Sequence, residues 1–158
     1  MIRPTAAVLS TAVALSLAAA LSPLAASAQP APDRAVVATR DAPEAIGPHS
    51  QAIRVGNTLY LAGQIALDPA TNQMIADRSI EAETRRVLDN LKAVVEAAGF
   101  RMEDVVSTTV FMADLGEFAR MNAVYATYFP SNPPARATVQ AARLPRDVRV
   151  EIAAVAAR

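Results

Sequence analysis

The sequence predicts an α+β domain in which two helices cover one face of a single mixed β-sheet. Two observations predict it: apolar residues follow helical spacing in 80–98 and 115–129, and β-type segments precede, separate and follow these two stretches. The resulting order, βββαβαββ, allows both helices to pack on the same face. Valines and leucines on the other face would form an exposed apolar patch, so we expect self-association there.

The first three strands are predicted from alternation and turn residues. Residues 35–39 are a short strand candidate, and residues 51–55 and 58–62 flank a Gly56-Asn57 pair. These turn residues tolerate the positive φ of a tight hairpin. The following 68–72 stretch, DPATN, has the composition of a loop.

The first helix has the clearest local signals. Its apolar positions are Ile80, Val87, Leu88, Leu91, Val94, Val95 and Ala98. Ser79 is placed to cap the amino end, and Gly99 is a natural stop at the carboxyl end. The spacing predicts a helix over 80–98.

The second half of the chain supplies a strand, a helix and two more strands. Residues 105–112 are rich in β-branched side chains, which favour a strand, and Asp114 precedes a helical pattern over 115–129. On this helix Phe118, Met121, Val124 or Tyr125, and Tyr128 share a face. The segment 133–158 reads as two strands around a Leu-Pro-Arg-Asp turn.

Each of these last strands presents a polar side chain on rigid backbone. Alternation in 148–152 directs Glu151 away from the apolar face, and Arg136, Thr138 and Gln140 project together from the preceding strand. A guanidinium suits a carboxylate ligand because it makes two parallel charge-assisted hydrogen bonds. A nearby glutamate could orient a water or accept its proton. Solvated polar residues on a strand are commoner, so alternation alone leaves both interpretations open.

Composition excludes several other classes. The 158 residues carry 15 basic and 15 acidic side chains without a block of one sign, so the chain lacks the basic footprint of a nucleic-acid binder. The absence of cysteine excludes disulfides, thiol nucleophiles and thiolate metal sites, and a single histidine, His49, excludes a multi-histidine metal site. A Ser-His-Asp triad built from Ser50 or Ser107 lacks a nucleophile-elbow motif. A small, roughly neutral partner fits better.

The first residues differ from the rest in composition. Arg3 precedes an Ala/Leu/Val run, then Pro23 and an Ala-Ser-Ala sequence ending at Ala28. This order predicts a signal peptide over 1–28, cleaved after Ala28, and export to the periplasm or outside the cell without a stable membrane anchor. An uncleaved anchor and a misplaced start codon are the alternatives. A flexible lead-in over 29–34 and one domain over 35–158 follow.

Five stretches of the mature chain match one family: APEAIGPHSQA, LYLAGQIALDP, TRRVLDNLKAVVEAAGF, DVVSTTVFMADLGEFARMNAVYATYF and PPARATVQAARLPRDVRVEIAAVA. They extend from about Ala42 to the C-terminus, and the last keeps the spacing from Arg136 to Glu151 without insertion. On these motifs the chain resembles the RidA family, also called YjgF/YER057c/UK114. The resemblance implies a chorismate-mutase-like fold, a homotrimer with three clefts at subunit boundaries, and no cofactor.

The resemblance also implies an activity, the hydrolysis of 2-imino or 2-enamino acids to 2-keto acids and ammonia. In this activity Arg136 holds the substrate carboxylate and Glu151 orients the attacking water. The Gly63 backbone lines the pocket, and Asn122 and Thr138 lie near the site. Such hydrolysis needs a fixed electrophile and a positioned water rather than a covalent nucleophile.

Two positions depart from the family pattern. His49 stands where many members have tyrosine, and Ala62 stands where many have serine. We hypothesise that His49 replaces the tyrosine hydrogen bond with a pH-dependent one. The departures and the leader also favour an alternative, a non-catalytic trimer that binds small carboxylates or acts as a chaperone. RNA cleavage, an older suggestion for the family, has little support without a basic surface.

Overall fold

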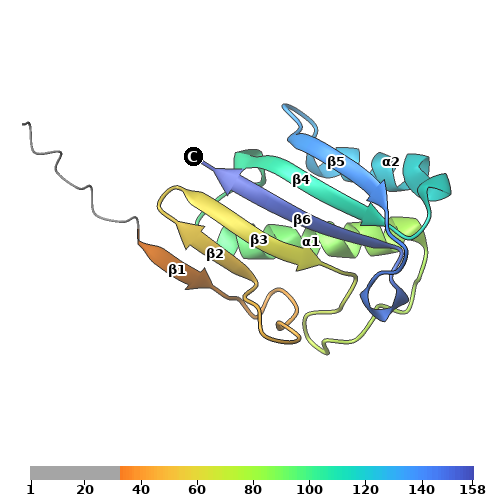
Figure 1. Cartoon of the computed structure of the whole chain (residues 1–158), viewed down its shortest axis with the longest axis horizontal. Coiled ribbons are helices and arrows are strands. Elements are labelled where there is room, and N and C mark those ends of the chain that lie inside the picture. Colours follow the sequence, from red (N-terminus) through yellow and green to blue (C-terminus); the bar gives the residue numbers. More distant parts are fainter. Residues whose placement is uncertain (1–32) are drawn as a thin grey trace, which may run out of the picture. The chain divides into compact units, whose positions relative to one another are not determined.

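The fold is taken from a computed structural model, which describes residues 33–158 (Figure 1). Its elements are β1 (Arg34–Val37), β2 (Ala52–Val55), β3 (Thr58–Gln64), α1 (Ile80–Ala97), β4 (Val105–Met112), α2 (Phe118–Tyr128), β5 (Ala135–Gln140) and β6 (Val150–Ala157), with short 3₁₀ turns at Met102–Asp104, Leu115–Glu117 and Pro145–Asp147. This order confirms the predicted βββαβαββ. The predicted signal peptide lies outside the described residues, as does most of the lead-in, and β1 begins at Arg34 rather than residue 35.

The six strands form one sheet in the order β1-β2-β3-β6-β4-β5. All neighbours are antiparallel except β4 and β5, which are parallel. Parallel pairing follows from the helical crossover through α2, since parallel neighbours need a long connection. The two last strands are therefore not adjacent, because residues 141–149 carry the chain past β4 to a central position between β3 and β4. The turn between them therefore does not make β5 and β6 neighbours in the sheet.

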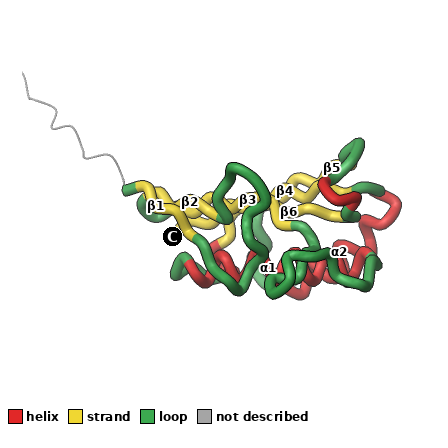
Figure 2. The backbone as a smooth tube through the Cα atoms, turned by 90° about the horizontal axis from the view of Figure 1, so that it is seen from below, coloured by secondary structure: helices red, strands yellow, loops and turns green. Residues whose placement is uncertain are grey.

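Both helices cover the same face of the sheet (Figure 2). Ser79 caps α1 by accepting a hydrogen bond from the Ala82 N–H at 3.3 Å, and Gly99 takes a left-handed φ of 78° after the last turn. These features confirm the predicted start of the first helix, which ends at Ala97, one residue before the predicted end. Apolar side chains of α1 and alternate residues of β6 and β3 form the core: Ile80, Val87, Leu88, Leu91, Val94, Leu59, Leu61, Val150 and Ile152.

The second helix starts later than its apolar pattern predicts. Residues 115–117 form a separate 3₁₀ turn, and α2 begins at Phe118. The Asp114 carboxylate accepts from the Gly116 N–H at 2.7 Å, and the Asp114 carbonyl accepts from the Glu117 N–H at 3.2 Å. These local bonds close a tight turn that competes with the first helical turn.

The face away from the helices is partly apolar and open. Val36, Tyr60 and Val139 are 60%, 53% and 44% exposed, and strand pairing places them on this face, which they share with Glu151. The predicted apolar second face is therefore present, while self-association through it stays a prediction. No helix within residues 33–158 is long and apolar enough to span a membrane.

Candidate functional site

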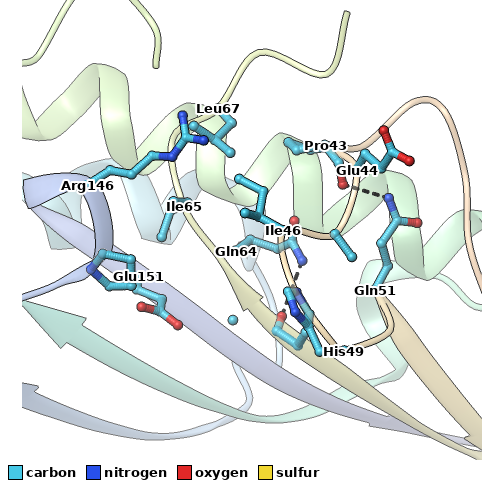
Figure 3. Close-up of a pocket in the computed structure, with 14 residues that line it drawn as sticks. Pro43, Glu44, Ile46, His49, Gln51, Gln64, Ile65, Leu67, Arg146 and Glu151 are labelled. Atoms are coloured by element: carbon cyan, nitrogen blue, oxygen red, sulfur yellow. Dashed lines mark hydrogen bonds between the residues drawn. The ribbon is translucent and has the colours of Figure 1, made fainter. Parts of the chain in front are cut away.

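A pocket of about 440 Å³ lies where the 43–49 loop, the end of β3 and the turn before β6 meet (Figure 3). Much of its wall is apolar, with Pro43, Ile46, Ile65 and Leu67 among the contributors. The polar and charged side chains that line it are Glu44, His49, Gln51, Gln64, Arg146 and Glu151. Its size lies within the roughly 300–1,000 Å³ of small-molecule pockets.

The Glu151 carboxylate lies against the backbone of Gly63. The β3–β6 ladder shifts register between Leu61 and Gln64, and this bulge brings Gly63 next to Glu151. A Cβ at position 63 would overlap Glu151 Oε1 and lie 2.9 Å from its Cδ, so only glycine leaves room for this carboxylate. Bulges of this kind often re-aim a side chain beside an active site.

The protonation of Glu151 is shifted by its surroundings. Its side chain is half-buried, and desolvation raises the pKa of this carboxyl above its ordinary value. A carboxylate with a raised pKa binds a proton more tightly, which makes it a better general base near neutral pH. Glu151 is thus equipped to take a proton from a water held in the pocket.

A buried glutamine holds the loop that forms the opposite wall. The Gln51 Nε2 donates to the carbonyls of Pro43, Thr39 and Ala42 at 2.7, 3.0 and 3.3 Å, and its Oε1 accepts from the Thr39 N–H at 2.7 Å. These bonds satisfy backbone groups that would otherwise be unpaired in a loop. His49, in the same loop, is exposed and lines the pocket, while its role in binding stays a prediction.

Arg136 does not share this pocket. Its strand partner Thr108 faces the helices, where the Thr108 Oγ1 lies 2.7 Å from the Tyr125 hydroxyl, so Arg136 projects to the helix-covered face. Its guanidinium carbon lies 4.5 Å from the ring centroid of Tyr125 and 5.5 Å from that of Phe118, within cation–π range. Glu151 projects from the opposite face of the sheet.

The predicted site residues therefore fall into two groups within one chain. The pocket group is Gly63, His49 and Glu151, together with Ala62. The edge group is Arg136 and Thr138 on β5 and Asn122 on α2. Thr138 projects to the same side of β5 as Arg136, and helical spacing places Asn122 on the face of α2 that carries Phe118 and Tyr125. One chain does not bring the two groups together.

The sequence interpretation missed two residues that lie beside these groups. Phe118 was assigned to the apolar face of its helix, but it is 38% exposed and lies against Arg136. Arg146 lines the pocket from a left-handed backbone position, for which an arginine gives no local signal. Among residues 33–158 no group of three or more His, Asp or Glu side chains could hold a metal ion.

Comparison with known proteins places this arrangement in a family. The family model described as Endoribonuclease L-PSP matches residues 39–158. A RutC family protein of Pyrococcus horikoshii is 50% identical over 121 residues, which cover 77% of this chain and 95% of that protein. A 2-iminobutanoate/2-iminopropanoate deaminase of Escherichia coli K12 is 47% identical over 125 residues, 77% of this chain and 96% of that protein.

A solved structure shows the same fold. The crystal structure of the YjgF gene product of Escherichia coli is similar with a TM-score of 0.74 and 46% identity, over 78% of this chain and 98% of that one. The family-model match over residues 39–158 covers both the pocket group and the edge group. The chain therefore belongs to the Endoribonuclease L-PSP family, which is the RidA/YjgF family indicated by its motifs.

Proposed function

We propose that this protein hydrolyses 2-imino and 2-enamino acids to 2-keto acids and ammonia. The observation that carries the proposal is the Glu151 carboxylate, half-buried against Gly63 in a largely apolar pocket, with a pKa raised by desolvation. The relative named 2-iminobutanoate/2-iminopropanoate deaminase supports the substrate class.

The reaction needs one base and one anchor. Glu151 takes a proton from a water as the water oxygen bonds to the imine carbon, and the imine nitrogen gains a proton. Further proton transfer to nitrogen breaks the C–N bond, so ammonia leaves and the carbon keeps a C=O group. Glu151 ends in its starting state, and the net change is addition of one water and loss of one ammonia.

The anchor is Arg136 of a second copy of the chain. Arg136 lies on β5, which is an edge strand of the sheet formed by residues 33–158. Arg136 is exposed, and its guanidinium lies beside the Phe118 ring. We expect this edge to dock against the pocket of another copy. Arg136 would then bind the substrate carboxylate through two hydrogen bonds, close to the water that Glu151 of the other copy activates. The apolar open face supports such association, and the resemblance points to a cyclic homotrimer.

A binding protein without turnover is the second candidate. The observation that favours it is Ala62, which lines the pocket without the hydroxyl that many relatives carry. His49 departs from the family pattern in the same wall.

We also propose that the protein is exported, with residues 1–28 as its signal peptide. The proposal depends on the sequence pattern alone. Mass spectrometry of the protein recovered from the periplasm or medium tests it. A mature chain that begins at Gln29 is expected, and an intact Met1 in the cytoplasm would contradict it.

The activity is tested by trapping imines. An amino-acid oxidase generates 2-imino acids from alanine, and semicarbazide converts the imine that escapes hydrolysis into a semicarbazone. The wild type should lower semicarbazone formation, whereas Arg136→Ala and Glu151→Gln should not. A folded wild-type protein that leaves trapping unchanged, yet binds 2-oxobutanoate, would favour the binding protein.

A further inference from the structure

Arg146 faces the pocket, and no carboxylate of residues 33–158 pairs with it. It is exposed and lines the same pocket as Glu151 (Figure 3). Its hydrogen bond within residues 33–158 is a long one, from Nη1 to the Asn72 carbonyl at 3.5 Å. None of the ion pairs of this part of the chain includes Arg146.

The other arginines near the turn are neutralised. Arg143 makes two bonds to the Asp147 carboxylate, at 2.7 and 3.0 Å. Arg149 donates from Nη1 to Glu117 Oε2 at 2.8 Å. Because these carboxylates are already paired, Arg146 is the arginine of this turn whose charge no carboxylate of residues 33–158 neutralises.

An unfavourable backbone conformation places Arg146 there. Arg146 and Asp147 have φ values of 56° and 53°, in the left-handed region that side chains with a Cβ rarely occupy. Two such residues in succession persist only where surrounding structure holds them, and such positions cluster at functional sites.

A network anchored on one buried glutamate supplies that support. Arg78 donates from Nη2 to the Asp147 carbonyl at 2.9 Å, and the Arg149 N–H donates to Glu83 Oε2 at 2.6 Å. The Glu83 side chain is fully buried on α1 and also pairs with Arg78. The turn is thus tied to a core helix, and Arg146 is held at the pocket by contacts that do not involve its own side chain.

We propose that Arg146 binds a second anionic group, so that the pocket prefers 2-imino dicarboxylic acids. This inference rests on the proposed function. The first carboxylate of the substrate would bind Arg136 of the second copy, and the C=N carbon would lie beside Glu151. The intervening methylene groups would pack on apolar wall residues such as Ile65, and the distal carboxylate would reach Arg146. Glu44 lies on the opposite wall, beyond Pro43 (Figure 3).

The test compares two imines on the same variants. Oxidases generate one imine from alanine and one from glutamate, and kcat/KM is measured for wild type, Arg146→Gln, Arg146→Lys and Arg101→Gln. Arg101 is a matched control, since it is an exposed arginine paired with Glu103 outside the pocket. Loss of a charge-assisted bond should lower kcat/KM for the glutamate imine about 10- to 100-fold through KM, with little change for the alanine imine. Arg146→Lys should recover part of the loss. An equal effect on both imines, or none, would overturn the proposal.

A binding measurement separates this inference from the proposed function. If the wild type hydrolyses neither imine, the proposed function fails, and calorimetry with 2-oxoglutarate and 2-oxobutanoate then decides the role of Arg146. Tighter binding of 2-oxoglutarate, lost in Arg146→Gln but kept in Arg101→Gln, supports a dicarboxylate pocket. Equal affinity for the two acids refutes it.

Discussion

Replacing Gly63 by alanine tests the arrangement around Glu151 most sharply. The added methyl group would overlap Glu151 Oε1, with Cδ only 2.9 Å and Cγ 3.1 Å away. Ordinary carbon contacts need about 3.5–4.0 Å, so the carboxyl group must move by about 1 Å. A displacement of this size in a reacting group can lower a rate about 100-fold.

Stability should change far less than activity in this variant. The obstructing atoms are the far end of a flexible side chain, which can rotate away, and Gly63 does not have a positive φ that alanine would resist. We expect the unfolding temperature of Gly63→Ala to stay within about 5 °C of the wild type. Imine trapping gives the rate, and calorimetric or fluorescence unfolding gives the temperature.

Gly116→Ala is the matched control for this experiment. A methyl group there would also approach a carboxylate, that of Asp114 at 3.0 Å, but at the 3₁₀ turn that precedes α2, outside the pocket. This variant should keep near wild-type activity. Full activity in Gly63→Ala would refute the contact between Gly63 and a catalytic Glu151. A large drop in its unfolding temperature would mean that a lower activity reports unfolding rather than this contact.

Two further predictions concern carboxylates in the described domain. Burial raises the pKa of Glu151 in the folded chain. As the pH rises above the ordinary pKa of a glutamate, ionisation of Glu151 therefore costs the folded chain more free energy than the unfolded chain. Glu151→Gln should thus unfold at a higher temperature than the wild type at pH 7. The two unfolding temperatures should converge at about pH 3, where both side chains are neutral; no difference at pH 7 would contradict the shift. Glu83→Ala removes a fully buried carboxylate and should lower the free energy of unfolding by about 2–4 kcal/mol, measured by urea titration. The control is Glu81→Ala, on the same helix as Glu83. It breaks an exposed pair with Arg120 of α2 and should have little effect.

Local signals predicted the first helix and most strands. The hydroxyl of Ser79 and the left-handed Gly99 mark ends that depend on a few neighbouring residues, and 105–112 is a strand as its β-branched residues indicated. The start of the second helix was harder to predict, because the hydrogen bond of the Asp114 side chain to the Gly116 N–H competes with the first helical turn.

Local sequence signals could not predict that Arg136 and Glu151 project from opposite faces of the sheet. Alternation shows which residues of one strand share a face, but the common face of two strands depends on their pairing and register. Here β4 lies between β5 and β6, and the pairing of Arg136 with Thr108 directs its side chain to the helices. The bulge that brings Gly63 to Glu151 also depends on long-range pairing.

A shared site between chains is tested most directly by mixing two inactive variants. Arg136→Ala keeps Glu151, and Glu151→Gln keeps Arg136. In an equal mixture that is unfolded and refolded together, about one quarter of the sites would join an intact Glu151 from one chain to an intact Arg136 from its neighbour. We therefore predict recovery of about one quarter of wild-type activity, with none in variants refolded separately. No recovery in co-assembled oligomers would contradict a site built from two chains.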